Sequence, residues 1–194
     1  MSCFKSNISN EELAAMNKCL FTGDIQIIDT EAKCLQACEY LAVQPIIGFD
    51  TETRPSFRPG RTNSIALLQL SSSERCFLFR LSHIKLSSCI ARILANESIM
   101  KIGVAVRDDI RGLQKLRNFK ARNFVDLQTI APQWGIADKS LRKLAGIVLG
   151  QSVSKAQRLS NWEAANLTSA QINYAATDAW VCLEIYNRLL KETP

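Results

Sequence analysis

An apolar run that begins near Leu41 ends in two acids, Asp50 and Glu52, which are separated by one residue. The valine, isoleucine and phenylalanine residues around Pro45 predict a buried strand, and residues i and i+2 of a strand project from the same face. The two carboxylates therefore share one face. Carboxylates held so close raise each other's pKa unless a divalent cation lies between them. The alternative is a strand that runs out into solvent, where acids are ordinary.

The length and composition predict one globular domain with a short extension. A chain of 194 residues is long enough to bury a sizeable core. Its 47% of apolar and 22% of charged residues are typical of a soluble protein. No apolar run reaches the roughly 20 residues of a membrane span, and the first residues lack the apolar core of a secretory signal. We therefore expect a cytoplasmic protein that makes no membrane contact.

The chain is basic, with a net charge of +6 and a pI near 9.0. An excess of lysine and arginine predicts an anionic partner such as nucleic acid. The alternative is a soluble protein that is basic without such a partner. If phosphates are the partner, acids clustered in a basic chain require metal ions to mediate the contact.

The cysteines are odd in number and scattered through apolar surroundings. Cys34 and Cys38 have the i, i+4 spacing of a helix, but no second pair has metal-ligand spacing, and the single histidine, His83, is far away in the sequence. We interpret the thiols as buried and free. They are Cys3, Cys19, Cys34, Cys38, Cys76, Cys89 and Cys182.

Hydrophobic periodicity and capping residues predict an α/β protein with a mixed sheet flanked by helices. We expect strands at 25–28, around Asp50, and at 64–70, 75–80, 100–106 and 124–127. We expect helices at 10–19, 30–40, 81–95, after 106, and at 127–133, 140–149 and 168–190. The second helix is expected to turn Ala32, Leu35, Cys38 and Leu41 inward, and the helix after 106 to turn Ile110, Leu113 and Leu116 inward. The segment from 54 to 61, rich in proline and arginine, is predicted to be a loop.

Tyr174 and Asp178 lie four residues apart in the last predicted helix, so they project from one face. Small residues, Ala175, Ala176 and Ala179, allow that helix to pack closely against the sheet. A carboxylate on such a face is unusual unless it is paired or binds a metal. The alternative is an exposed aspartate at that turn.

Asp108 and Asp109 offer a further acid where a strand ends and a helix begins. Either could instead be the N-cap of that helix, because aspartate accepts hydrogen bonds from the free backbone amides of the first turn. One could cap the helix while the other faces the site. The spacing alone leaves this choice open.

Three segments in order resemble the exonuclease motifs of the DEDD superfamily: FDTE at 49–52, KIGVAVRDD at 101–109 and YAATDAW at 174–180. The tyrosine in the third motif is similar to the branch that contains ribonuclease D and the Werner-type exonuclease domain. NFVDL at 123–127, SLRKLAGIVLG at 140–150 and LSNWEAANLTSAQINYAATDAW at 159–180 extend the likeness to the Werner-type domain. The resemblance covers about 25–190 and implies a ribonuclease H-like fold with a central mixed sheet of five or six strands. We expect an exonuclease domain at 23–194 after an N-terminal helical extension at 1–22.

The resemblance also implies site residues. Asp109 is preferred over Asp108 because relatives place this acid six residues after the glycine of the strand, here Gly103. The histidine branch of the superfamily carries its histidine five residues before the last acid, where this chain has Asn173. The family's acids and tyrosine fall on Asp50, Glu52, Asp109, Asp178 and Tyr174.

The chemistry implied is hydrolysis at a 3′ end, releasing nucleoside 5′-monophosphates with the help of two Mg²⁺ or Mn²⁺ ions about 4 Å apart. Carboxylates are the hard oxygen ligands that such ions prefer. Asp50 would bridge both ions, Glu52 and Asp178 would complete the ion on the nucleophile side, and Asp109 would hold the other. Tyr174 would orient the attacking water, and its ordinary pKa near 10 excludes it as the base.

Substrate contacts are predicted around this site. Lys155 and Arg158 precede Trp162 and could contact phosphates or bases, and the backbone at Thr51 lies where the family holds a terminal nucleotide. The alternatives are solvated surface charges and a tryptophan that packs against the last helix. The predicted loop adds Arg54, Arg58 and Arg61.

Three functions remain open at this stage. The first is a DNA-directed 3′-5′ exonuclease, which the closeness to the Werner-type segment favours. The second is an RNA-trimming enzyme like ribonuclease D, although the chain is too short to add the C-terminal helical domains of that family. The third is a nucleic-acid-binding module without activity, against which the full set of acids and the tyrosine argue. Protein partners are not predicted.

Overall fold

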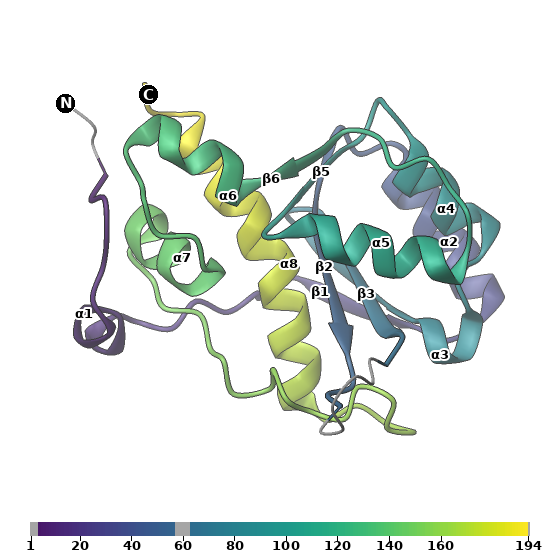
Figure 1. The fold of residues 1–194 in the computed structure, drawn as a ribbon. Helices are drawn as coiled ribbons and strands as arrows, with labels where there is room; N and C mark the ends of the chain where they lie inside the picture. The colour runs from purple at the N-terminus through teal and green to yellow at the C-terminus, as the bar shows by residue number, and fades with distance from the viewer. Residues whose placement is uncertain (1–3, 57–62, 194) are drawn as a thin grey trace.

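The computed structural model describes residues 4–56 and 63–193, and a six-stranded mixed sheet lies at its centre (Figure 1). The strand order is β1-β4-β3-β2-β5-β6. Strands β2, β3 and β4 are antiparallel neighbours, whereas β1 pairs with β4, and β5 with β2 and β6, in parallel. This confirms the predicted fold class. The strands are β1 (Asp24–Ile28), β2 (Ile46–Thr53), β3 (Ile65–Ser71), β4 (Arg75–Arg80), β5 (Met100–Gly103) and β6 (Phe124–Asp126).

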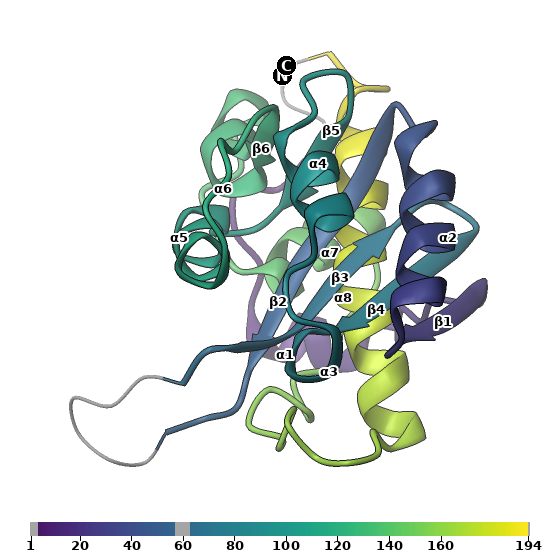
Figure 2. The ribbon, with the colours of Figure 1, turned by 90° about the vertical axis from the view of Figure 1, so that its right-hand side faces the viewer.

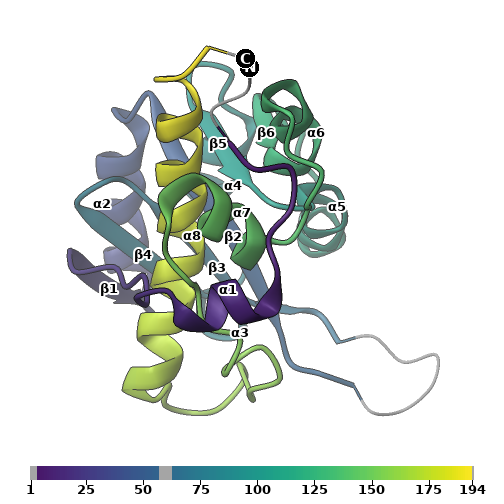
Figure 3. The ribbon, with the colours of Figure 1, turned by 90° about the vertical axis from the view of Figure 1, so that its left-hand side faces the viewer.

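Helices cover both faces of the sheet. Figure 2 looks onto the face covered by α2 (Glu31–Ala42), α4 (Ser88–Ala95) and α5 (Val106–Leu116). Figure 3 looks onto the other face, where α7 (Leu141–Leu149) and α8 (Ser169–Leu189) lie. The remaining helices are α1 (Asn10–Ala15), α3 (Leu81–Ile84), α6 (Leu127–Ile130) and the 3-10 helix η1 (Ala131–Trp134). Within the described part of the chain, no helix has the length and apolarity needed to cross a membrane.

Strand β3 is buried along its whole length because helices lie on both of its faces. Leu68 and Leu70 point to the core under α2 and α4, whereas Leu67 points to the core under α8. The alternation follows from the period of two residues along a strand. The sheet therefore separates two cores, and side chains from one strand reach both.

The longest helix, α8, packs closely against the middle of β2. Thr168 caps this helix as predicted, accepting a hydrogen bond from the Gln171 amide at 3.2 Å. A Cβ atom on Gly48 would lie 1.9 Å from the carbonyl oxygen of Ala179, so only glycine fits there. The contact between these two small residues lets the helix backbone approach the strand. It brings the acids of β2 next to the acid of α8.

Two predicted elements are shorter than expected because the backbone turns left-handed. The predicted helix at 81–95 is two helices, α3 and α4, since Lys85 has a φ of 56° and ends the first. Strand β5 ends at Gly103 rather than at 106, because Ala105 has a φ of 58° and starts α5. The sequence carries no glycine at either turn, which is the residue expected in this conformation.

The predicted inward faces of two helices were partly wrong. Leu35 is 47% exposed and Leu116 is 38% exposed, and Ala32 is also exposed. The helix α2 instead rests on the sheet through Cys34, Ala37, Cys38 and Leu41. The buried face of α2 is shifted from the predicted one because its helical spacing admits more than one apolar stripe. In α5, Leu113 is buried and Ile110 half-buried as predicted, and of the three residues only the last, Leu116, is exposed.

The N-terminal residues pack against α7 and α8 (Figure 3). Ser9 caps α1, as predicted. Leu13 is buried against Gly146 of α7, so closely that a Cβ atom on this glycine would lie 2.3 Å from the Leu13 side chain. Further along, the amide of Phe21 donates to the Thr177 hydroxyl at 3.1 Å. The described residues before β1 therefore cover this helical layer. The division into an extension at 1–22 and a domain at 23–194 stays a prediction.

Candidate active site

The candidate site lies where β2 extends beyond β5. The ladder between these strands runs from Ile46 opposite Met100 to Gly48 opposite Ile102, while β3 continues to pair with the rest of β2. Asp50 and Glu52 therefore follow the last residue that β5 covers. The end of the sheet is open on this side.

Three carboxylates converge here. One oxygen from each of Asp50, Glu52 and Asp178 lies within 4.8 Å of the other two. Glu52 and Asp178 are buried, with exposures of 8% and 5%, and Asp50 is half-buried. The strand supplies two of the acids from one face, and the close approach of α8 supplies the third. The predicted pairing of the β2 acids with that of α8 is what the structure shows.

Burial raises the pKa of each of these acids, and repulsion from neighbouring carboxylates raises the pKa of Asp50 and Glu52 further. Burial first, and then the charge of Asp178, raise the pKa of Asp50 well above its ordinary value and that of Glu52 to about 9. Burial raises the pKa of Asp178 to about 7, against a hydrogen bond from Tyr174. The carboxylates therefore retain protons near neutral pH unless a positive charge joins them.

The donor atoms fit divalent cations. Among the residues that the structure describes, the Oδ1 atom of Asp178 is buried and has no hydrogen-bond partner. A buried carboxylate oxygen without a partner is costly in a folded protein. Clustered carboxylate oxygens are the ligands that Mg²⁺ and Mn²⁺ prefer, so an ion at this point would satisfy both the charge and the orphan oxygen.

Asp109 approaches the cluster from the other face of the sheet, at the start of α5. Its carboxylate accepts a hydrogen bond of 2.5 Å from the hydroxyl of Thr51, which projects from the face of β2 opposite to Asp50. Burial raises the pKa of Asp109 to about 6, and the Thr51 hydrogen bond opposes this rise. Its charge also contributes to the raised pKa of Asp50. Asp109 therefore lies beside the group of three acids rather than within it.

The neighbouring acid, Asp108, is exposed at the surface and is not part of the group of three acids. Its side chain is 91% exposed and forms an ion pair of 3.5 Å with Arg111. Neither aspartate is the N-cap of α5, because the cap is Ala105 and no side chain of this helix occupies that role. The structure thus resolves the choice between Asp108 and Asp109 in favour of Asp109 as the acid that faces the site.

Asp126 is a positioning residue that the sequence reasoning missed. Its carboxylate accepts hydrogen bonds from the amides of Ala105 at 3.0 Å and Val106 at 3.2 Å, and from Gln128 at 2.9 Å. It therefore replaces the missing cap of α5 from the end of β6 and fixes the turn that precedes Asp109. An acid at the end of the predicted strand in NFVDL was the available signal.

Tyr174 lies one turn before Asp178 on α8 and forms a hydrogen bond with it. Burial first, and then the charges of Asp178 and Glu52, raise the pKa of Tyr174 above its ordinary value. The hydroxyl therefore stays protonated at neutral pH. Tyr174 can donate a hydrogen bond at the cluster, but it cannot act as a base there.

The Trp162 ring packs against the Tyr174 ring. Its ring centroid lies 6.0 Å from that of Tyr174, and its side chain has no exposed surface. A substrate cannot reach a fully buried side chain, so the prediction that Trp162 contacts the substrate is wrong. The alternative, packing against the last helix, is what the structure shows.

The predicted basic contacts are in different places. Arg158 is exposed, and its charge lowers the pKa of Glu52, which places it beside the acids. Lys155 instead lines a separate hollow with Lys18 and Arg142. Arg58 and Arg61 lie outside the described residues.

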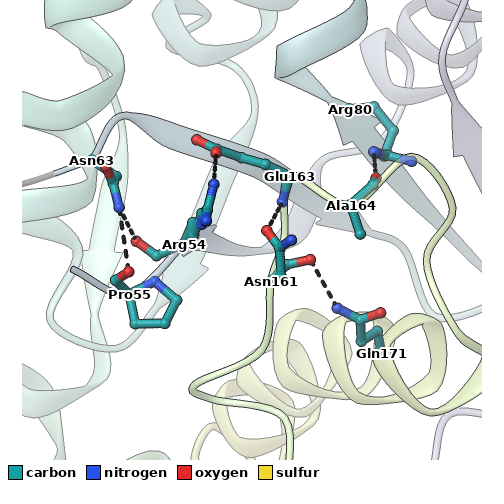
Figure 4. Close-up of polar contacts among 8 residues, drawn as sticks. All are labelled: Arg54, Pro55, Asn63, Arg80, Asn161, Glu163, Ala164 and Gln171. Carbon is teal, nitrogen blue, oxygen red and sulfur yellow. Dashed lines mark hydrogen bonds and ion pairs between the residues drawn. The ribbon is translucent and has the colours of Figure 1, made fainter. Parts of the chain in front are cut away.

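The segment between α7 and α8 is held to the end of β2, to β4 and to the start of α8 by polar contacts (Figure 4). Glu163 of this segment forms an ion pair of 3.2 Å with Arg54, which directly follows β2. The buried guanidinium of Arg80 donates to the carbonyl oxygens of Ala164 and Ala165. These contacts fix the chain that carries Arg158 and Trp162. Arg54 is thus engaged with protein rather than pointing freely into solvent.

A hollow of about 940 Å³ lies beside Asp109. Its lining includes two basic residues of α5, Arg111 and Lys115, together with Thr53 at the end of β2 and Asn63. The sequence reasoning missed these two cations. Their i, i+4 spacing on the helix that begins beside Asp109 was the signal that could have identified them.

Gln69 is a second buried group that the sequence reasoning missed. It lies directly opposite Asp50 in the β2–β3 ladder, so both side chains project from the same face. The residue has no exposed surface, and among the described residues its amide nitrogen and oxygen have no hydrogen-bond partner. A polar residue in the middle of an apolar strand was the signal.

A mixed sheet whose open end gathers buried carboxylates is typical of the ribonuclease H-like nucleases, a class with this fold. The family model described as 3′-5′ exonuclease matches residues 25–194. This chain therefore belongs to the 3′-5′ exonuclease family.

Relatives from the comparisons agree with this assignment. The mouse protein named bifunctional 3′-5′ exonuclease/ATP-dependent helicase WRN is 30% identical over 97% of this chain and 15% of its own length. The crystal structure of the Aedes aegypti Nibbler EXO domain has a TM-score of 0.81 at 23% identity, covering 89% of this chain and 91% of that one, and it shows the shared fold. Escherichia coli RNase D, described as an exoribonuclease involved in structured RNA processing, has a TM-score of 0.78 at 26% identity. The match covers 87% of this chain and 44% of RNase D, so this chain spans less than half of RNase D and of WRN.

Proposed function

We propose that this protein is a metal-dependent 3′-5′ exonuclease of the tyrosine branch, which hydrolyses phosphodiester bonds at nucleic-acid 3′ ends and releases nucleoside 5′-monophosphates. The observation that carries this proposal is the convergence of Asp50, Glu52 and Asp178 within 4.8 Å, with a buried oxygen of Asp178 that has no hydrogen-bond partner among the described residues. Three clustered acids with raised pKa values ionise together only when cations offset their charge. The membership of the exonuclease family supports the reaction.

The proposed cofactors are two divalent cations, Mg²⁺ or Mn²⁺. Asp50, Glu52 and Asp178 hold one ion, and Asp50 and Asp109 hold the other. When bound, such ions make a coordinated water acidic and offset the charge of the reacting phosphate. The position of Asp109 supports a second ion. Its charge raises the pKa of Asp50, but its carboxylate is not one of the three that lie within 4.8 Å of one another.

The protein's own side chains orient the reactants. The Tyr174 hydroxyl stays protonated and hydrogen-bonds Asp178, so it can hold the attacking water in place. The Thr51 hydroxyl hydrogen-bonds Asp109. The Thr51 backbone lies between two proposed ligands, and we propose that it contacts the terminal nucleotide. Trp162 acts only through Tyr174, which it supports by packing.

Basic residues around the acids are proposed to contact the phosphates of the strand. Arg158 lies near Glu52, and Arg111 and Lys115 line the hollow beside Asp109. Cations along a groove attract the nucleic-acid backbone without reading its sequence. Lys155 lies in a separate hollow with Lys18 and Arg142, so it contacts only a more distant part of a strand.

DNA is the favoured substrate, because the segments at 123–127, 140–150 and 159–180 extend the likeness to the Werner-type domain. The alternative is RNA 3′-end trimming, which the likeness to E. coli RNase D supports. A nucleic-acid-binding module without activity is the weakest alternative. It would retain neither the convergence of the acids nor the protonated Tyr174 beside them.

Degradation of defined 3′ ends tests this proposal. A 5′-labelled single strand of DNA, a recessed duplex and an RNA strand of the same sequence are incubated with the protein and Mg²⁺ or Mn²⁺. We expect a ladder of shortened products from DNA, none with chelator, and nucleoside 5′-monophosphates as the released products. A ladder on RNA alone would establish the alternative substrate. Binding without a ladder on any substrate would contradict the proposed activity.

A further inference from the structure

Three cysteine thiols meet between α2 and α4, away from the acids. One Sγ atom from each of Cys34, Cys38 and Cys89 lies within 4.8 Å of the other two, and the Cys34 and Cys89 sulfurs are 3.4 Å apart. All three side chains are buried, with exposures of 1%, 6% and 6%. Figure 2 shows the two helices side by side on the face of the sheet that α8 does not cover.

We propose that Cys34, Cys38 and Cys89 form a second metal site, which binds one thiolate-preferring cation of the Zn²⁺ class and joins α2 to α4. Soft sulfur ligands select Zn²⁺ over the Mg²⁺ and Mn²⁺ proposed for the carboxylates. The two clusters are therefore expected to bind different ions in one chain.

The spacing of the sulfurs suits such an ion. Zinc–sulfur bonds of about 2.3 Å in a tetrahedral site place neighbouring sulfurs about 3.8 Å apart. The observed 3.4 Å between Cys34 and Cys89, and the limit of 4.8 Å for the whole group, bracket this value. Cys34 and Cys38 share a face of α2 through their i, i+4 spacing, and Cys89 comes from the first turn of α4. Only small side-chain movements separate the observed cluster from a ligand set.

A fourth ligand position is present beside the thiols. The Ser87 hydroxyl lies 3.3 Å from the Cys34 sulfur and 3.0 Å from the Cys89 sulfur. Ser87 and Cys34 line one hollow, and Cys38 and Cys89 line another with Arg92. A water or the hydroxyl can complete four-coordination from the first hollow, and an ion can enter through either.

The thiols of the cluster share protons through hydrogen bonds. The bond between Cys38 and Cys34 lowers the pKa of Cys34, whereas the same bond and burial raise the pKa of Cys38, so one thiol is the first to ionise and the other keeps its proton. A metal ion displaces the remaining protons, because thiolates are the ligands. Binding would then stabilise the fold, since the unfolded chain cannot bring Cys89 to the α2 pair.

Cobalt substitution tests this site in the full-length protein. The protein is stripped with chelator, kept reduced with a phosphine and titrated with Co²⁺. We expect a thiolate-to-cobalt charge-transfer band that saturates at one equivalent and is bleached by Zn²⁺. The carboxylate site contains no sulfur and produces no such band, so the result does not depend on the proposed nuclease activity.

Matched cysteine substitutions show which thiols produce the charge-transfer band. Cys89→Ser is expected to weaken Co²⁺ binding by about 10- to 100-fold, and Cys34→Ser with Cys38→Ser to abolish the band. Cys76→Ala removes another buried thiol, on β4, and is expected to leave the band unchanged. A band that persists unchanged in Cys89→Ser would overturn the site.

A measurement on the unsubstituted protein decides the matter even if those variants fail to fold. X-ray absorption of the zinc-loaded protein is expected to show a sulfur shell at about 2.3 Å. A shell of oxygen alone, or the absence of a cobalt band while mass spectrometry shows all thiols reduced, would overturn the proposal. A Cys34–Cys89 disulfide formed under the same reducing conditions would also overturn it.

Discussion

Two buried clusters of metal-ligand side chains lie on opposite faces of one sheet and differ in their donor atoms. The acid cluster of Asp50, Glu52 and Asp178 faces α8, whereas the thiol cluster of Cys34, Cys38 and Cys89 lies between α2 and α4. Buried carboxylates repel one another and leave an oxygen of Asp178 without a partner. Buried thiols can remain neutral and hydrogen-bond one another.

Without metal, the acid cluster therefore lowers the stability of the fold, whereas the thiol cluster does not. Without a cation, the acid cluster retains protons at a free-energy cost, which the rest of the fold must sustain. The thiol cluster carries no such cost in its neutral form. We therefore expect removal of metal from the acid cluster to lower both activity and stability, and removal of metal from the thiol cluster to lower stability alone.

The largest expected effect is loss of activity on neutralising an acid. Asp50→Asn or Asp178→Asn should lower the rate of 3′-end degradation by at least about 1000-fold, the scale on which a catalytic group acts. Strand binding should persist, because the basic groove is unchanged. The matched control is Asp108→Asn, whose side chain is 91% exposed and is not one of the three clustered acids. Near-normal turnover in either of the first two variants would remove the acid cluster from the mechanism.

The next-largest effect tests whether Tyr174 orients the attacking water or binds the metal ion. Tyr174→Phe removes a hydroxyl that hydrogen-bonds Asp178 but is not proposed as a ligand. We expect turnover to fall by about 10- to 100-fold, while the Mn²⁺ concentration at half-maximal activity changes little. Titration of activity against Mn²⁺ measures both quantities. A large shift in metal affinity would instead make the tyrosine part of the ion site.

The pH dependence of stability distinguishes the acid cluster from the thiol cluster. Asp109, Asp178 and Glu52 have pKa values of about 6, 7 and 9 in the folded protein, above the ordinary values of 3.8 and 4.5. The folded state therefore holds more protons than the unfolded state between these limits, and stability falls as pH rises through them. Urea unfolding of metal-free protein at several pH values measures this fall.

Glu52→Gln isolates the contribution of one acid to that fall. The loss of stability between pH 7 and 9 should be smaller in this variant than in the unsubstituted protein, and saturating Mg²⁺ should reduce the same loss. Comparison of the two proteins cancels the contributions of other titrating groups to the pH dependence. One of them is Lys101, whose pKa burial lowers to about 8, so that its contribution to stability rises with pH. Equal slopes in both proteins would show that Glu52 is ionised in the metal-free fold.

The smallest effect concerns the buried amide next to the acids. Gln69→Met removes two unpartnered polar atoms at nearly constant volume and should raise the free energy of unfolding by about 1 kcal/mol. The control is Gln171→Met, because Gln171 is buried but hydrogen-bonded to Thr168 and Asn161. That variant should lower the free energy of unfolding. A loss of stability in Gln69→Met would show that the amide is satisfied in the folded protein.

The sequence was informative where ligands are close along the chain. Asp50 and Glu52 share a strand face, and Tyr174 and Asp178 share a helix face, so local periodicity predicted each pair. The mixed sheet, the capping residues Ser9 and Thr168, and the buried free thiols among the described cysteines were likewise confirmed. The choice of Asp109 over Asp108 needed the resemblance to a family, because spacing does not show which way a helix start faces.

The sequence was uninformative where partners are distant or the backbone is unusual. Cys89 joins Cys34 and Cys38 only through the packing of α4 on α2, which no local pattern reports. The left-handed turns at Lys85 and Ala105 occur without glycine and shortened two predicted elements. Asp126 acts through amides of a distant turn. Each miss arises from tertiary contact that overrides local preference.

The most direct test of the account is the anomalous diffraction of a crystal soaked in Mn²⁺ with a short DNA strand. The account predicts manganese peaks among the carboxylates of Asp50, Glu52 and Asp178, with Asp109 beside them and the 3′-terminal nucleotide against them. Peaks elsewhere, or carboxylates that turn away from one another with no ion between them, would contradict it.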